Sequence, residues 1–302
     1  MRARAPFRLD LTVWALRRRA LNEVDAWDGS TYRRVLVLDG EPVEIGVTQE
    51  GGTEAPVLHV AFEGLRSAAS ESTRGEVRAA LEKMLSPGLD IDPFYTLAGA
   101  DPMLASLAWR FRGLRPPRFA SVFECLVNAI ALQQLSLDAG LTLVNRLTRA
   151  YGASASTTGS RVCAFPGHAE LAGARPESIH ALGFSLRKAT TIVAIATAAA
   201  EGRLVLESLA TRTDEEVVER LTSIPGLGRW SAEYTLLRGL GRLHVFPGDD
   251  VGARKNLARW LGLEKPLDYA GVGRAVAGWR PYAGLVYFHL LLDRLASRGA
   301  VE

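Results

Sequence analysis

The feature that most constrains this sequence is a glycine-containing turn between two helical segments. One helical pattern covers Asp214 to Thr222, the turn carries Pro225, Gly226 and Gly228, and a second helical pattern begins near Arg229. Because proline and glycine interrupt a helix, this stretch is expected to fold as two short helices that meet at a tight turn. The sequence therefore predicts a helical hairpin.

Such a hairpin has the properties of an anion site. Gly226 and Gly228 lack a Cβ atom, so the turn can adopt positive φ and its backbone can approach a ligand closely. The following helix begins with unpaired N–H groups and the positive end of its dipole, which suits a phosphate group. An ordinary corner between two helices, without a ligand, has the same pattern. The hairpin alone leaves both interpretations open.

Aromatic and acidic residues follow the turn. Trp230 and Tyr234 are four residues apart and share one face of a helix, where they either belong to the core or stack on an extruded base. Asp249 and Asp250 precede a helix expected over 251–261, and aspartate is a favoured N-cap. We expect one aspartate to cap this helix while the other projects.

These residues resemble a known family. The hairpin with its Trp230, followed by Phe246-Pro247 and Asp250, is similar to the helix-hairpin-helix DNA glycosylases, and within them to the DNA-3-methyladenine glycosylase II branch. Residues 123–136, 182–189 with 201–204, and 279–282 add to the likeness, which spans residues 90–295. The resemblance implies an α+β fold: a small antiparallel sheet domain, similar to half of a TATA-binding protein, precedes a mostly helical body of two subdomains with the active site between them.

The resemblance also implies an activity. The protein would be a monofunctional base-excision repair glycosylase that flips alkylated, 3-methyladenine-like bases out of double-stranded DNA and hydrolyses their N-glycosidic bond. Asp250, which directly precedes the Val251-Gly252 step, would stabilise the oxocarbenium-like transition state and position water. Trp230 and Tyr234 would form the base pocket. Strand-cleaving relatives carry a lysine where Trp230 stands, so no lyase activity is expected.

Further residues are implied as DNA contacts. Gln133 or Gln134 would fill the gap left by the flipped base, although both also suit a solvated helix C-terminus. The expected hairpin contacts are Pro225, Gly226, Leu227, Gly228 and Arg229. Main-chain carbonyls of Thr222, Ile224 and Leu227 would hold a monovalent Na⁺ or K⁺ ion, and no other cofactor is expected.

Two other functions fit parts of the pattern. The chain could be a non-catalytic DNA-binding module, with the hairpin on DNA and the aspartates as caps, or a repair protein specific for strand architecture. The sequence also departs from the family pattern at Ala283, where an arginine is common, and near Leu291, where an aromatic side chain can line the pocket. These departures leave the range of lesions open.

Charge and composition give weaker information. The 302 residues carry a net charge of +3, a weak signal for nucleic acid binding. Basic residues form two local clusters, each of which either faces DNA or is an ordinary solvated helix face. The first cluster is Arg110, Arg112, Arg115 and Arg118, and the second is Arg254, Lys255 and Arg259. Two cysteines are too few for a four-cysteine iron-sulfur cluster and indicate a reducing compartment. No long apolar run is present, so we expect a cytoplasmic protein that does not bind membranes. We also expect a monomer.

Periodicity outlines the domains. Alternating stretches at 33–38 and 57–62, with turns at 39–40 and 50–52 and a helix over 75–85, predict a sheet domain in residues 1–88. From residue 93 the pattern is helical, with expected helices over 102–111, 119–132, 139–150, 176–182 and 188–201 and a loop over 153–159. We expect one helical subdomain in 89–118 plus 245–302, carrying Asp250, and another in 119–244, ending in the hairpin.

Overall fold

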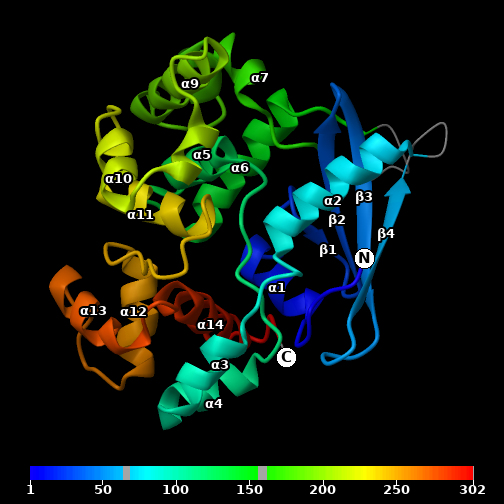
Figure 1. The fold of residues 1–302 in the computed structure, drawn as a ribbon. Coiled ribbons are helices and arrows are strands. Elements are labelled where there is room, and N and C mark those ends of the chain that lie inside the picture. The colour runs from blue at the N-terminus through cyan, green and yellow to red at the C-terminus, as the bar shows by residue number, and fades with distance from the viewer. Residues whose placement is uncertain (64–68, 156–161, 302) are drawn as a thin grey trace.

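An antiparallel sheet forms the N-terminal part of the molecule. The computed structural model describes residues 1–63, 69–155 and 162–301 (Figure 1), so the loop predicted over 153–159 lies partly outside the described residues. The strands, which pair in chain order, are β1 Ala26–Trp27, β2 Thr31–Leu38, β3 Glu41–Glu50 and β4 Val57–Glu63. The sheet predicted from alternation is confirmed.

The turn between β2 and β3 follows from its two residues. Asp39 and Gly40 have φ values of 50° and 80°, and Leu38 pairs with Glu41 across them. This is the two-residue turn that Asp-Gly favours, because its twist matches that of the strands.

Two helices flank this sheet. They are α1, Leu9–Arg17, and α2, Glu71–Leu85, whose apolar faces share a buried cluster with strand residues such as Tyr32 and Ile45. Helix α2 begins before the predicted Gly75, because the Ser70 side chain accepts a hydrogen bond from the Thr73 amide and caps it.

One helical part of the body surrounds the C-terminal helix. Its elements are α3 Asp92–Gly99, α4 Pro102–Arg110, α12 Val251–Trp260, α13 Tyr269–Ala275, the 3₁₀ helix η2 Ala277–Trp279, and α14 Ala283–Ala296. Their buried apolar side chains form one cluster, which Leu11 and Ala15 of α1 join. In Figure 1 these elements occupy one end of the molecule. Segments distant in sequence, before 111 and after 250, thus share a core.

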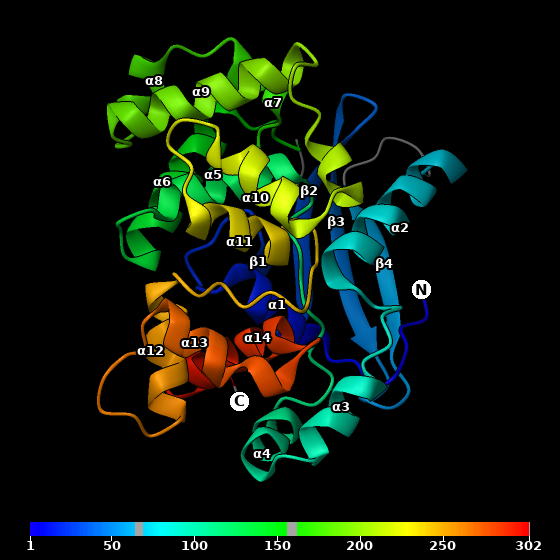
Figure 2. The ribbon, with the colours of Figure 1, turned by 60° about the vertical axis from the view of Figure 1, so that its left-hand side comes forward.

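A second helical part holds the hairpin. Its elements are α5 Val122–Leu132, α6 Leu137–Tyr151, α7 His168–Ala172, α8 Pro176–His180, α9 Leu186–Ala200, the 3₁₀ helix η1 Leu206–Thr211, α10 Asp214–Thr222 and α11 Arg229–Arg238. They enclose a separate apolar cluster. Both views show α11 at the edge of this part, next to α12 and α13 (Figure 2).

Capping serines explain where several predicted helix boundaries are wrong. The helix predicted from 119 begins at Val122, and those predicted from 139 and 188 begin at Leu137 and Leu186. In each case the preceding serine accepts a hydrogen bond from an amide in the first turn. The domain boundaries at 88, 118 and 244 stay a prediction. Among the described residues, no helix is long and apolar enough to cross a bilayer.

Candidate active site

The predicted hairpin forms between α10 and α11. A capping box, Thr213 with Glu216, starts α10. Gly226 has φ +95°, and a Cβ atom there would lie 2.4 Å from Oγ1 of Thr191, so this position requires glycine. Gly228 has φ −119°, so the positive φ of the turn is at Gly226 and not at Gly228. A Cβ on Gly228 would meet open space, which leaves the backbone accessible.

The start of α11 is suited to an anion. Its N-cap, Gly228, offers no side-chain acceptor to the amides of the first turn. Arg229 is the first helical residue, and half of its side chain is exposed, with a fraction of 52%. The unpaired amides, the helix dipole and the guanidinium therefore place positive charge at one point of the surface.

The glutamine loop is fastened to this hairpin. Gln133 Nε2 donates to Gly226 O over 2.9 Å and to Ser231 Oγ over 3.1 Å. Lys188 Nζ donates to Ala131 O over 3.0 Å and to Gln133 O over 2.7 Å, which caps the end of α5. The side chain of Gln133 is therefore used within the protein, and Gln133 connects the loop to the turn.

The tip of the loop is exposed. Gln134 adopts a left-handed conformation, with φ 57°, and is exposed. Leu135 follows it and keeps 45% of its surface exposed, although it is apolar. Leu135 was not among the residues predicted to contact DNA. The sequence does contain a sign of its exposure. Ser136 caps α6, so Leu135 lies in the loop before that helix.

The two predicted pocket aromatics differ in exposure. Trp230 and Tyr234 have ring centroids 5.4 Å apart and an interplanar angle of 34°. Trp230 is half-buried, whereas Tyr234 is 2% exposed and also packs on Phe119. Tyr234 therefore packs against Trp230 on its buried side, and of the two rings only that of Trp230 is accessible.

Asp250 caps one helix and accepts a hydrogen bond from a side chain of another. Its Oδ1 accepts the Ala253 amide over 2.8 Å, and its Oδ2 accepts the indole Nε1–H of Trp230 over 3.2 Å. Asp249 instead accepts from Arg229 Nε over 2.7 Å. The expectation that one aspartate caps and the other projects is corrected: Asp250 does both, and Asp249 pairs with the hairpin.

Residues from distant segments complete the surroundings. Arg18, the C-cap of α1, donates to the Tyr234 hydroxyl over 2.9 Å and to Asn128 Oδ1 over 3.2 Å. Burial lowers the pKa of Arg18. Burial and then the charge of Asp250 raise the pKa of Tyr287, on α14, well above its ordinary value. Neither residue could be found by local pattern, because both reach the site through tertiary packing.

The two arginine-rich clusters have different environments. In the first, Arg115 is buried, while Arg110 pairs with Asp293 over 2.8 Å and Arg112 with Glu54 over 2.9 Å. These three arginines are therefore held by other parts of the protein. In the second, Arg254 and Lys255 line a hollow of 370 Å³ with Val251, Pro266, Leu267 and Asp268.

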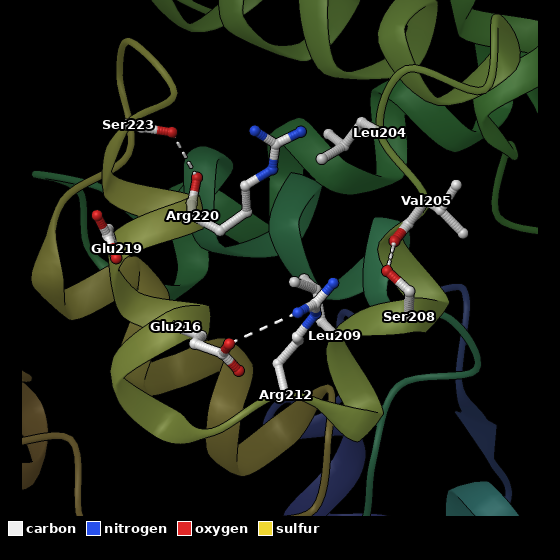
Figure 3. A pocket seen from close by; sticks show the side chains of 9 residues that line it. All are labelled: Leu204, Val205, Ser208, Leu209, Arg212, Glu216, Glu219, Arg220 and Ser223. Atoms are coloured by element: carbon white, nitrogen blue, oxygen red, sulfur yellow. Dashed lines mark hydrogen bonds and ion pairs between the residues drawn. The ribbon is translucent and has the colours of Figure 1, made fainter.

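A larger hollow lies elsewhere, between η1 and α10. It measures 520 Å³, and Figure 3 shows its lining side chains, among them Arg212, Glu216 and Arg220. Arg212 and Glu216 form an ion pair of 3.5 Å across it. Neither Trp230 nor Asp250 lines this hollow, so its size does not mark the site.

The positions departing from the family pattern belong to the helical core. Ala283 is fully buried at the start of α14, and Leu291 is half-buried against the same cluster. For the predicted cation site, Ile224 O accepts the Leu227 amide over 3.1 Å. A carbonyl oxygen has a second lone pair, so this bond is compatible with an ion at Ile224.

Comparisons with known proteins identify the family of this chain. The family model for HhH-GPD superfamily base excision DNA repair proteins matches residues 127–280. A DNA-3-methyladenine glycosylase of Bacillus subtilis is 33% identical over 67% of this chain, and the match spans 66% of that relative, just under two thirds. A 3-methyladenine DNA-glycosylase from Archaeoglobus fulgidus superposes with a TM-score of 0.85 at 28% identity, over 98% of both chains. A Schizosaccharomyces pombe 3-methyladenine DNA glycosylase in complex with abasic DNA has a TM-score of 0.56 at 28% identity, over 66% of this chain and 94% of that one. The chain belongs to the HhH-GPD superfamily of base excision DNA repair proteins.

Proposed function

We propose that this protein is a monofunctional DNA glycosylase that removes alkylated, 3-methyladenine-like bases from double-stranded DNA. The observation that carries the proposal is the hydrogen bond of 3.2 Å from Trp230, in the first turn of the hairpin helix, to Asp250. An aromatic face and a carboxylate thus lie together near the N-terminus of α11, which supports the proposal. Family relatives that are named 3-methyladenine DNA glycosylases support the choice of substrate.

DNA would be bound at the hairpin and at the loop. The open backbone at Gly228 and the Arg229 side chain would bind a phosphate. The carbonyls of Thr222, Ile224 and Leu227 would hold a monovalent cation, which supplies further positive charge when bound. The exposed loop tip, Gln134 and Leu135, would enter the stack where the base has left, because apolar side chains fill such a gap well.

The flipped base would stack on Trp230. An alkylated purine is electron-poor, and an aromatic face attracts it as it attracts a cation, by about 0.5 to 2 kcal/mol. A damaged base is also cheaper to extrude than a normal one. Selection of alkylated over normal bases would therefore combine stacking on Trp230 with the reduced cost of flipping.

Asp250 would act on the sugar. Breaking the N-glycosidic bond develops positive charge on the sugar ring, which a fixed carboxylate stabilises, and the same carboxylate orients the attacking water. A backbone amide and an indole N–H, one on each carboxylate oxygen, hold the group in place before reaction. An alkylated base carries its positive charge while it is attached to the sugar. When the N-glycosidic bond breaks, the base takes the bonding electron pair and leaves as a neutral molecule, so its departure needs no separate general acid.

Base release tests the proposal directly. Purified protein is incubated with duplex DNA treated with a methylating agent, and free 3-methyladenine is measured by chromatography. Release of the base is expected. Absence of release from alkylated, deaminated and oxidised duplexes alike would overturn the glycosylase assignment.

Strand cleavage is tested separately. Trp230 has no amine with which to form a Schiff base at the sugar, so the product should be an intact strand with an abasic site. Borohydride should trap no covalent complex of protein and DNA. A trapped adduct would contradict the monofunctional mechanism while leaving base removal intact.

A further inference from the structure

A buried carboxylate lies one helical turn after Arg229. Glu233 is 7% exposed, and its Oε2 accepts the Gly248 amide over 3.0 Å, while its Oε1 accepts the Tyr269 hydroxyl over 2.6 Å. Burial raises the pKa of Glu233. Burying a carboxylate is costly unless its oxygens are hydrogen-bonded, so these two donors define its place in the structure.

The partners of Glu233 also contact each other. A Cβ atom on Gly248 would lie 2.7 Å from carbons of the Tyr269 ring, so this ring packs directly on the Gly248 backbone. The Arg229 guanidinium lies 3.8 Å from the centre of the Tyr269 ring and pairs with Asp249 over 2.7 Å. The five residues Glu233, Gly248, Asp249, Arg229 and Tyr269 form a closed ring of contacts.

This closed set of contacts among five residues fixes the main chain that leads to Asp250. Gly248 and Asp249 directly precede Asp250, and each is held by a residue of α11: Gly248 by Glu233, and Asp249 by Arg229. Because α11 also carries Trp230, the carboxylate of Asp250 is placed relative to one rigid helix. A catalytic group displaced by about 1 Å can lose about 10²-fold in rate.

The two ties respond differently to DNA. The pair of Arg229 and Asp249 is solvent-accessible, with side-chain exposures of 52% and 29%, so a phosphate that binds Arg229 competes with Asp249. The tie from Glu233 to Gly248 is buried and does not compete with phosphate. It would therefore remain if DNA released the other.

We propose that Glu233 is a positioning residue, which holds the Gly248–Asp250 segment on α11 and so keeps the Asp250 carboxylate against Trp230 while Arg229 binds DNA. The effect on rate rests on the proposed glycosylase function. The effect on the contact between Asp250 and Trp230 does not, and it is measured independently.

The test compares Glu233→Ala with Glu233→Gln by the indole N–H resonance of Trp230 in ¹⁵N-labelled protein. Trp230→Phe assigns this resonance, and Asp250→Asn gives its position when the carboxylate is removed. A glutamine at 233 can accept the Gly248 amide and donate to the Tyr269 oxygen, so Glu233→Gln should keep the wild-type resonance. Glu233→Ala should move it toward its position in Asp250→Asn.

Activity gives the second reading. Under single-turnover conditions Glu233→Ala should release base about 10²-fold more slowly, Glu233→Gln should recover most of the rate, and affinity for abasic duplex should change little. Tyr269→Phe removes one donor without opening a cavity, so it gives a smaller change of the same kind if Glu233→Ala does not fold. An unchanged Trp230 resonance and an unchanged rate in both Glu233→Ala and Tyr269→Phe would overturn the proposal. If wild-type protein releases no base at all, the glycosylase assignment fails, and the resonance alone decides the role of Glu233.

Discussion

The indole N–H of Trp230 donates a hydrogen bond of 3.2 Å to the carboxylate of Asp250, whose other oxygen caps α12. The contact joins α11 to the N-cap of α12. Helix α11 contributes Ala232 and Leu236 to one apolar cluster and Leu237 to the cluster that contains Ala253 and Leu257 of α12. The ring proposed to bind the base is thus the same ring that orients the proposed catalytic group.

Trp230→Phe should separate these two roles. Phenylalanine keeps an aromatic face but lacks the N–H, and a hydrogen bond to a charged acceptor is worth about 1.5 to 3 kcal/mol. We expect single-turnover base release to slow by about 10- to 100-fold. Trp109→Phe, at an exposed position on α4, should leave the rate unchanged. Equal rates for Trp230→Phe and wild type would show that the indole N–H is unimportant.

The two glycines of the hairpin should respond differently to alanine. At Gly226 the φ of +95° and the close approach of Thr191 oppose a side chain, so Gly226→Ala should lower the free energy of unfolding by about 1 to 3 kcal/mol. Gly228→Ala meets no neighbour within 4 Å and should cost much less. Urea denaturation of both variants measures the difference. Similar destabilisation of both would mean that Gly226 is not the strained position of the turn.

The hairpin and the two aspartates were predictable because their signals are local. Proline, glycine and N-cap patterns act within a few residues, so the sequence indicated the hairpin, the shared face of Trp230 and Tyr234, and a helix after Asp250. Arg18 and Tyr287 were not predictable, because each reaches the site from a distant segment of the chain. For the same reason the sequence could not show that Gln133 uses its side-chain amide on Gly226.

Arg254 and Lys255 should contribute to DNA affinity. They line a hollow with Val251, the residue after Asp250, and removing one phosphate-binding side chain reduces the slope of log affinity against log salt by about 1. We expect Arg254→Gln combined with Lys255→Gln to reduce the slope by about 2, measured by fluorescence anisotropy. Arg110→Gln, at a position paired with Asp293, serves as the control and should leave the slope unchanged. An unaltered slope in the double variant would place the DNA elsewhere.

Stability should fall on mild acidification because of His289. This buried residue on α14 has its pKa lowered by burial, from 6.5 to about 4. The unfolded chain therefore binds a proton that the folded chain excludes, so stability present above pH 6.5 is lost as the pH falls toward 4. The difference corresponds to about 3 kcal/mol. His289→Phe, which keeps a ring beside Phe94, should lose less stability than wild type between pH 7 and 4.5 in urea denaturation. Parallel declines in the two proteins would contradict the assignment.

The most direct test of the central claim is the single-turnover release of 3-methyladenine by Asp250→Asn. Asp101 provides a matched control, because it caps α4 and accepts an indole N–H, that of Trp279 over 3.4 Å. Asparagine is as good an N-cap as aspartate, so both substitutions should have a small and similar effect on stability. We predict that Asp250→Asn loses at least about 10²-fold in rate, while Asp101→Asn releases base as wild type does. Full activity in Asp250→Asn, or an equal decrease in both variants, would contradict the role of Asp250 in catalysis.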